Sequence, residues 1–75
     1  MLNLRIEELF SEGKFEELEE MVKKINTTDL VRALSKIDKD LLADIFPKLP
    51  EEVSARVFVK FQRPMQAYLQ RDRNR

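Results

Sequence analysis

Apolar residues recur at helical spacing through the first 25 positions of the chain. In the first stretch, Leu2, Ile6, Leu9 and Phe10 fall on one face of a helix. Gly13 follows in the sequence SEG, and glycine readily takes the left-handed conformation that closes a helix. The segment KFEELEEMVKKI then repeats the spacing with Phe15, Leu18, Met21 or Val22, and Ile25. This pattern predicts two helices joined at Gly13.

From Ile25 onward the sequence divides into four blocks of twelve residues with matching apolar positions. The blocks are INTTDLVRALSK, IDKDLLADIFPK, LPEEVSARVFVK and FQRPMQAYLQRD. The first position is large and apolar: Ile25, Ile37, Leu49 and Phe61. The seventh is small or β-branched: Val31, Ala43, Ala55 and Ala67. The ninth is apolar in every block: Ala33, Ile45, Val57 and Leu69.

Each block opens with residues that favour the start of a helix. Asn26 and Asp38 are capping residues, whose side chains accept hydrogen bonds from the first free amides of a helix. Pro50 and Pro64 fall in the first turn of their blocks, where the missing amide hydrogen costs nothing. Pro47 falls where the preceding helix is expected to end. The prolines therefore separate short helices.

A twelve-residue block leaves about eight helical residues, or about 12 Å of helix. Helices this short are marginal alone and persist by packing on their neighbours. We therefore expect an all-α fold, a compact right-handed, solenoid-like array of about six helices, two longer ones followed by four of about eight residues. Residues 1–70 form one domain in this interpretation, and residues 71–75 form a frayed, charged C-terminal tail.

The amino-acid composition excludes several kinds of catalytic and binding site. The 75 residues include no cysteine, no histidine and a single glycine, which excludes thiolate chemistry, a histidine base and a glycine-rich phosphate loop. We expect the three serines, Ser11, Ser35 and Ser54, to occupy turns or helix surfaces, and we expect no enzymatic activity. No apolar run is long enough to span a membrane, and the first residues lack the basic and apolar regions of a signal peptide. We therefore expect a cytoplasmic chain without direct membrane insertion, either on its own or as the soluble part of a membrane protein.

Charge is balanced overall but unevenly distributed. Residues 1–20 carry seven glutamates against two basic residues, and residues 53–75 carry six arginines and lysines against Asp72. The net charges of these segments are −5 and +5. The simplest interpretation is that solvated helix faces carry these charges, and the alternative is that opposite ends pair within a chain or between copies.

The order of these motifs resembles the cytoplasmic N-terminal domain of MgtE-type magnesium transporters, over roughly the first half of that domain. The stretch IEELFSEGKFEELEEMVKKI is similar to its first helix pair, and INTTDLVRALSKID to the entry of its first short helix. LPEEVSARVFVKF resembles its repeat at five positions: Leu49, Pro50, Ala55, Val57 and Phe58. A similar helical array occurs in the middle region of the flagellar motor switch protein FliG.

The resemblance implies a superhelical regulatory domain that precedes a pair of CBS domains and a transmembrane pore. Magnesium between the soluble domains of such transporters is thought to hold the pore shut. This chain carries Arg56 where the family repeat often has an acid, and a cation there repels a metal. We therefore assign no metal ligands and no cofactor, although the acids Asp38, Asp40 and Asp44 could recruit magnesium weakly. The glutamates at positions 16, 17, 19 and 20 are interpreted as a solvated helix face.

The expected functional surface is the open C-terminal end, where an exposed apolar stripe would mark a docking site. The residues assigned to partner binding are Arg56, Lys60, Arg63, Met65, Tyr68, Leu69 and Arg71. The first hypothesis is a non-catalytic interaction module that docks on an adjacent domain or on a second copy. Two alternatives are a nucleic-acid-binding protein that uses the basic C-terminal region with Phe61 and Tyr68, and a FliG-like scaffold that assembles with itself.

Overall fold

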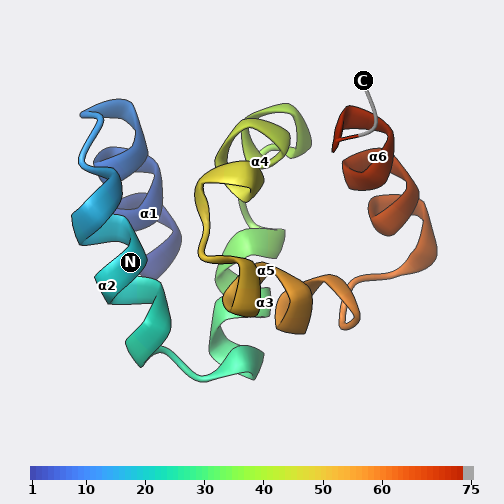
Figure 1. The fold of residues 1–75 in the computed structure, drawn as a ribbon, viewed down its shortest axis with the longest axis horizontal. Helices are drawn as coiled ribbons and strands as arrows, with labels where there is room; N and C mark the ends of the chain where they lie inside the picture. The colour runs from blue at the N-terminus through green and yellow to red at the C-terminus, as the bar shows by residue number, and fades with distance from the viewer. Residues whose placement is uncertain (74–75) are drawn as a thin grey trace.

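The computed structural model describes the backbone of residues 1–73 and the side chains of residues 1–70, and it is all-α (Figure 1). The elements are α1 (Leu2–Ser11), α2 (Phe15–Lys24), α3 (Thr27–Ser35), α4 (Lys39–Ile45), the 3-10 helix η1 (Phe46–Lys48), α5 (Glu51–Phe58) and α6 (Arg63–Arg73). The described part of the chain contains no strand, and none of its helices is long and apolar enough to cross a membrane. The predicted fold class and the six helices are confirmed.

The helices pack mainly on alternate neighbours. α1 pairs with α2, and beyond that hairpin α1 packs on α3, α3 on α5, and α4 on α6. Figure 1 shows the α1–α2 pair at one end of the longest axis and α6 at the other. The molecule measures 27 × 24 × 21 Å along its principal axes. The right-handed, solenoid-like winding stays a prediction.

One core runs through all six helices, and the ninth position of the twelve-residue block belongs to it throughout. Ala33, Ile45, Val57 and Leu69 are each at most 5% exposed. These side chains come from four successive helices, so each short helix contributes an anchor to the same cluster. Burial of this kind removes apolar surface from water and is the main force that holds such short helices in place.

Local chemistry sets the helix ends as predicted. The Asn26 Oδ1 atom accepts a hydrogen bond from the Asp29 amide at 2.8 Å, and the Asp38 carboxylate accepts one from the Asp40 amide at 3.1 Å. Gly13 has a φ of +74°, and its amide donates to the Phe10 carbonyl at 3.1 Å. The next amide donates to the Leu9 carbonyl at 2.9 Å, which completes the glycine-terminated helix end called a Schellman motif.

The prolines separate the later helices. Pro47 lies in η1, directly after α4 ends at Ile45. Pro50 is the N-cap of α5 and precedes its two acidic first-turn residues. Pro64 is the second residue of α6, where the helix has no internal acceptor for an amide hydrogen.

Two details differ from the twelve-residue pattern. The seventh-position residues Ala55 and Ala67 are exposed, because a helix turns by about 100° per residue and Ala55 points away from the face that buries Val53 and Val57. The last helix is eleven residues long and not about eight, since no proline or glycine follows Pro64 to end it. It continues to Arg73, within the segment assigned to the charged tail, and residues 74–75 lie outside the described residues.

The Asn26 cap gives a direct test of this local chemistry. Asn26→Ala removes the acceptor for the Asp29 amide and is expected to lower the free energy of unfolding by about 1 kcal/mol. Thr28→Ala, at an exposed position in the same turn, serves as the control and should change it by less than about 0.5 kcal/mol. Urea denaturation followed by circular dichroism measures both values. Equal losses for the two variants would show that the cap does not stabilise α3.

Candidate docking surface

α6 is held in place by one buried side chain and one bridging amide. Leu69 is 1% exposed and is the anchor of α6 in the core, where α6 packs on α4. The Gln66 Nε2 atom donates to the Phe58 carbonyl at 2.9 Å and to the Phe61 carbonyl at 3.0 Å. These bonds tie the start of α6 to the end of α5 and add to the Leu69 anchor in setting the orientation of α6.

A shallow depression of about 300 Å³ lies on α6 beside the start of α4, and we call it the α4–α6 depression. It is lined by Lys39, Pro64, Met65, Ala67 and Tyr68. The Tyr68 hydroxyl donates to the Asp40 carboxylate, and the Lys39 Nζ atom lies 5.3 Å from the Tyr68 ring centroid. A cation over an aromatic face at this distance is attracted by the ring electrons. The depression therefore combines an apolar wall with a cation held beside an aromatic ring.

The residues assigned to partner binding from the sequence fall into four groups. Met65 and Tyr68 are half-buried and line the α4–α6 depression. Leu69 was expected on the surface but is in the core, because it shares the ninth block position with the other anchors. The side chain of Arg71 lies outside the described residues. The exposed cations Arg56, Lys60 and Arg63 do not line the depression.

Sequence reasoning missed three residues of the depression: Lys39, Pro64 and Ala67. Lys39 opens α4, whereas Tyr68 is in α6, and no spacing rule links the two blocks. Only the packing of α4 on α6 brings them together. Ala67 stands out in the sequence only as the small residue at the seventh block position, and its exposure follows from the direction that α6 faces.

The acids considered for magnesium are used in other ways or are solvated. The Asp38 carboxylate caps α4, and the Asp40 carboxylate accepts the Tyr68 hydroxyl. Within the described residues, no group of three or more acidic side chains is placed to hold a metal ion. The glutamates at positions 16, 17 and 20 are exposed, and Glu19 is half-exposed.

The three serine hydroxyls all bond to the backbone of their own helices. Ser11 Oγ donates to the Glu8 carbonyl at 3.0 Å, Ser35 Oγ to Val31 at 2.8 Å and Ser54 Oγ to Glu51 at 3.0 Å. The expected helix positions are confirmed for all three, although Ser54 is buried and not on the surface. None of these hydrogen bonds joins a serine to an acid or a lysine side chain, so no activated nucleophile is formed by them.

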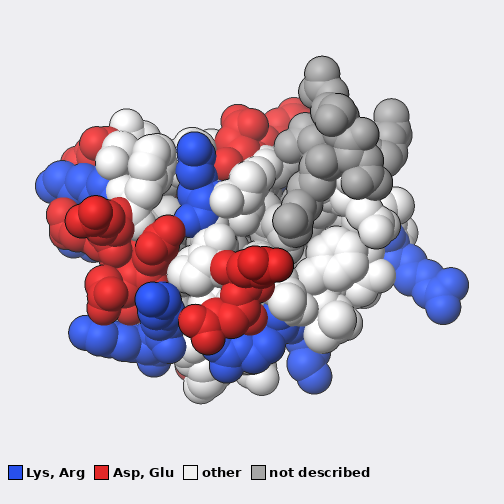
Figure 2. Space-filling view, viewed as in Figure 1, with Lys and Arg blue, Asp and Glu red and all other residues white. Residues whose placement is uncertain are grey.

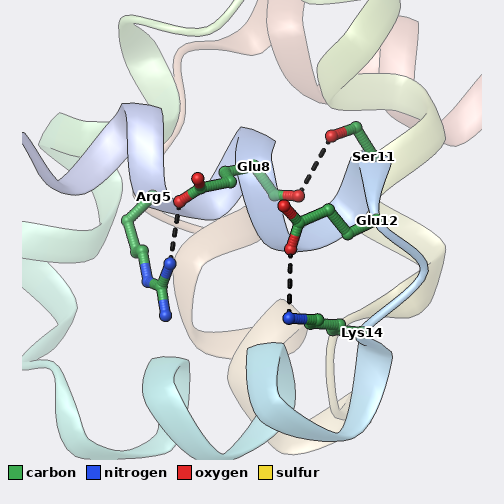
Figure 3. A network of polar contacts seen from close by, with 5 residues as sticks. All are labelled: Arg5, Glu8, Ser11, Glu12 and Lys14. Atoms are coloured by element: carbon green, nitrogen blue, oxygen red, sulfur yellow. Dashed lines mark hydrogen bonds and ion pairs between the residues drawn. The ribbon is translucent and has the colours of Figure 1, made fainter.

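Charged side chains cover both ends of the molecule. Figure 2 shows acidic side chains gathered, with some lysine and arginine, over the α1–α2 end, and basic side chains projecting at the opposite end. The ion pairs among the described residues are both local: Arg5 to Glu8 at 2.7 Å and Lys14 to Glu12 at 3.3 Å (Figure 3). Both pairs are exposed and contribute little to stability.

No family model, curated protein or solved structure matches the chain.

Proposed function

We propose that this chain is a non-catalytic regulatory module that works by docking the α4–α6 depression on a partner domain. The observation that carries the proposal is the half-exposed pair Met65 and Tyr68, held rigidly by the buried Leu69 anchor and flanked by Lys39. Partly exposed methionine and tyrosine side chains supply contact area with little loss of side-chain freedom when they are already fixed. The chain has no histidine or cysteine, and its serines are tied to backbone carbonyls, which favours binding over catalysis.

The partner in this proposal is a CBS-type domain of an MgtE-type magnesium transporter, in the cytoplasm. Its support is the resemblance of the helix pair and of the LPEEVSARVFVKF repeat to the N-terminal domain of those transporters. Lys39 lines the depression, and Arg63 lies next to it in α6, directly before the lining residue Pro64. These two cations favour an acidic surface on the partner. Magnesium enters as a modulator between domains and not as an ion held by this chain alone.

Nucleic-acid binding has less support. It requires aromatic side chains free to stack on bases beside a basic surface. Phe61 is only 8% exposed, and Tyr68 is engaged with Asp40 and Lys39. The exposed cations Arg56, Lys60 and Arg63 would then act alone, giving weak binding that is lost as salt is raised.

The proposal is tested by titrating a purified CBS-domain pair of an MgtE-type transporter into the 15N-labelled chain, with and without millimolar magnesium. Chemical-shift changes are expected at Lys39, Met65 and Tyr68. Ala67→Glu places a charge in the depression without touching the core and should weaken binding at least about tenfold. The matched control is Ala55→Glu, at the same block position but outside the depression, and it should bind normally. Absence of shifts at these residues, or equal effects of the two variants, contradicts the proposal.

A further inference from the structure

A second hollow lies at the opposite end of the molecule, between α1 and α2, and we call it the acidic groove. It has a volume of about 550 Å³, with Leu9 and Met21 as its apolar floor. Three exposed carboxylates line it, Glu16, Glu17 and Glu20, together with the cations Arg5 and Lys24. Among the described residues, none of the three takes part in an ion pair, whereas the neighbouring Glu8 and Glu12 are paired (Figure 3). Arg5 is paired with Glu8, so within the described chain the three carboxylates of the groove face one unpaired cation, Lys24, and the groove joins an apolar surface to an excess of negative charge.

The turn after α5 has the opposite character, and we call it the basic turn. Val59 is 67% exposed, one of the most exposed large apolar side chains in the described chain. Arg56 lies one helical turn before it, Lys60 directly follows it, and Arg63 begins α6. These are the three charged residues between positions 53 and 70, and none forms an ion pair with a described residue. The Arg56 Nε atom donates only to the Glu52 carbonyl, at 3.4 Å.

The two surfaces match in chemistry but cannot meet within one chain. Each presents an apolar centre and an excess of one charge: the acidic groove has three carboxylates that outnumber its two cations, and the basic turn has three cations. The groove is formed by α1 and α2 at one end of the longest axis, while α5 lies near the middle and the turn after it leads away from α1 and α2 toward α6 (Figure 1). A second copy of the chain can bring its basic turn to the acidic groove of the first. We propose that the acidic groove of one copy binds the basic turn of the next, with Val59 over the half-buried Met21.

The contact is heterologous, because two different patches meet. Each added copy leaves one free groove and one free turn, so association continues head to tail unless a ring closes. Because the charges are exposed, screening shortens their range to about 8 Å at physiological ionic strength. Association should therefore be weak and should strengthen as salt is lowered. This contact uses neither Met65 nor Tyr68 and does not depend on docking through the α4–α6 depression.

Two neutralised variants test the pairing by sedimentation velocity in low-salt buffer. The groove variant is Glu16→Gln/Glu17→Gln/Glu20→Gln, and the turn variant is Arg56→Gln/Lys60→Gln/Arg63→Gln. Each alone should self-associate at least about tenfold more weakly than the unaltered chain. Mixed together, they should form a complex of two chains and no larger species, because only one intact groove and one intact turn can meet.

The control variant Glu12→Gln/Asp44→Asn/Glu52→Gln removes three exposed carboxylates outside the groove and should associate like the unaltered chain. Circular dichroism checks that each variant keeps its helices. Val59→Asn, at an exposed site that does not contribute to the core, removes the apolar contact without changing the charge and should also weaken association. A strict monomer at millimolar concentration in low salt overturns the proposal, and so does a mixture that forms no complex. Ala67→Glu should leave this association unchanged, which separates it from the proposed function.

Discussion

Phe46→Ala is expected to lower the free energy of unfolding by about 3–5 kcal/mol, the largest effect of any single truncation in the chain. Phe46 is 1% exposed and is the largest of the fully buried side chains among the described residues. Its ring lies 6.2 Å from that of Phe58, at a tilt of 48°. It sits in η1, where α4 ends and the chain turns toward α5, so the cavity would open between two short helices. A chain of this length has a total stability of about 4–11 kcal/mol, so the variant should be close to unfolding.

The matched control is Phe58→Ala, which removes the same atoms from a half-buried site. It should destabilise by about 1–2 kcal/mol, because part of that ring is already in contact with water. Urea denaturation followed by circular dichroism at 25 °C compares the two midpoints. Similar losses for both variants would mean that the burial of Phe46 does not set its contribution.

The sequence predicts most of the fold because local and repeated signals agree. Asn26, Asp38 and Gly13 mark helix ends by chemistry that acts within a few residues, and the structure confirms each of them. The ninth block position is apolar in every block and buried in every block, since it falls on the inner face of each short helix. Agreement between caps, prolines and apolar spacing makes one helical arrangement much more favourable than others.

The candidate site is harder to predict because it depends on contacts between distant blocks. Lys39 reaches Tyr68 only after α4 packs on α6, and the sequence separates the two by a whole block and more. Leu69 was assigned both to the ninth position and to the surface, and the choice between these depends on whether α6 is covered by another helix. Because α6 packs on α4, the Leu69 side chain lies in the core. Surface function therefore follows from tertiary packing, whereas the helices follow from local pattern.

Leu69→Ala is expected to release α6 selectively, with a loss of about 2–5 kcal/mol measured at that helix. Leu69 is the fully buried anchor of α6, whereas Met65 and Tyr68 are only partly covered. Protein segments open separately when few buried apolar contacts hold them, so hydrogen exchange should accelerate at α6 amides and change little in α1–α3. Met65→Ala, a truncation at a half-buried site of the same helix, is the control and should accelerate exchange much less. Equal acceleration in all helices would show that α6 unfolds only with the whole chain. Selective release would also remove the α4–α6 depression, so this variant should lose partner binding while most of its helical signal remains.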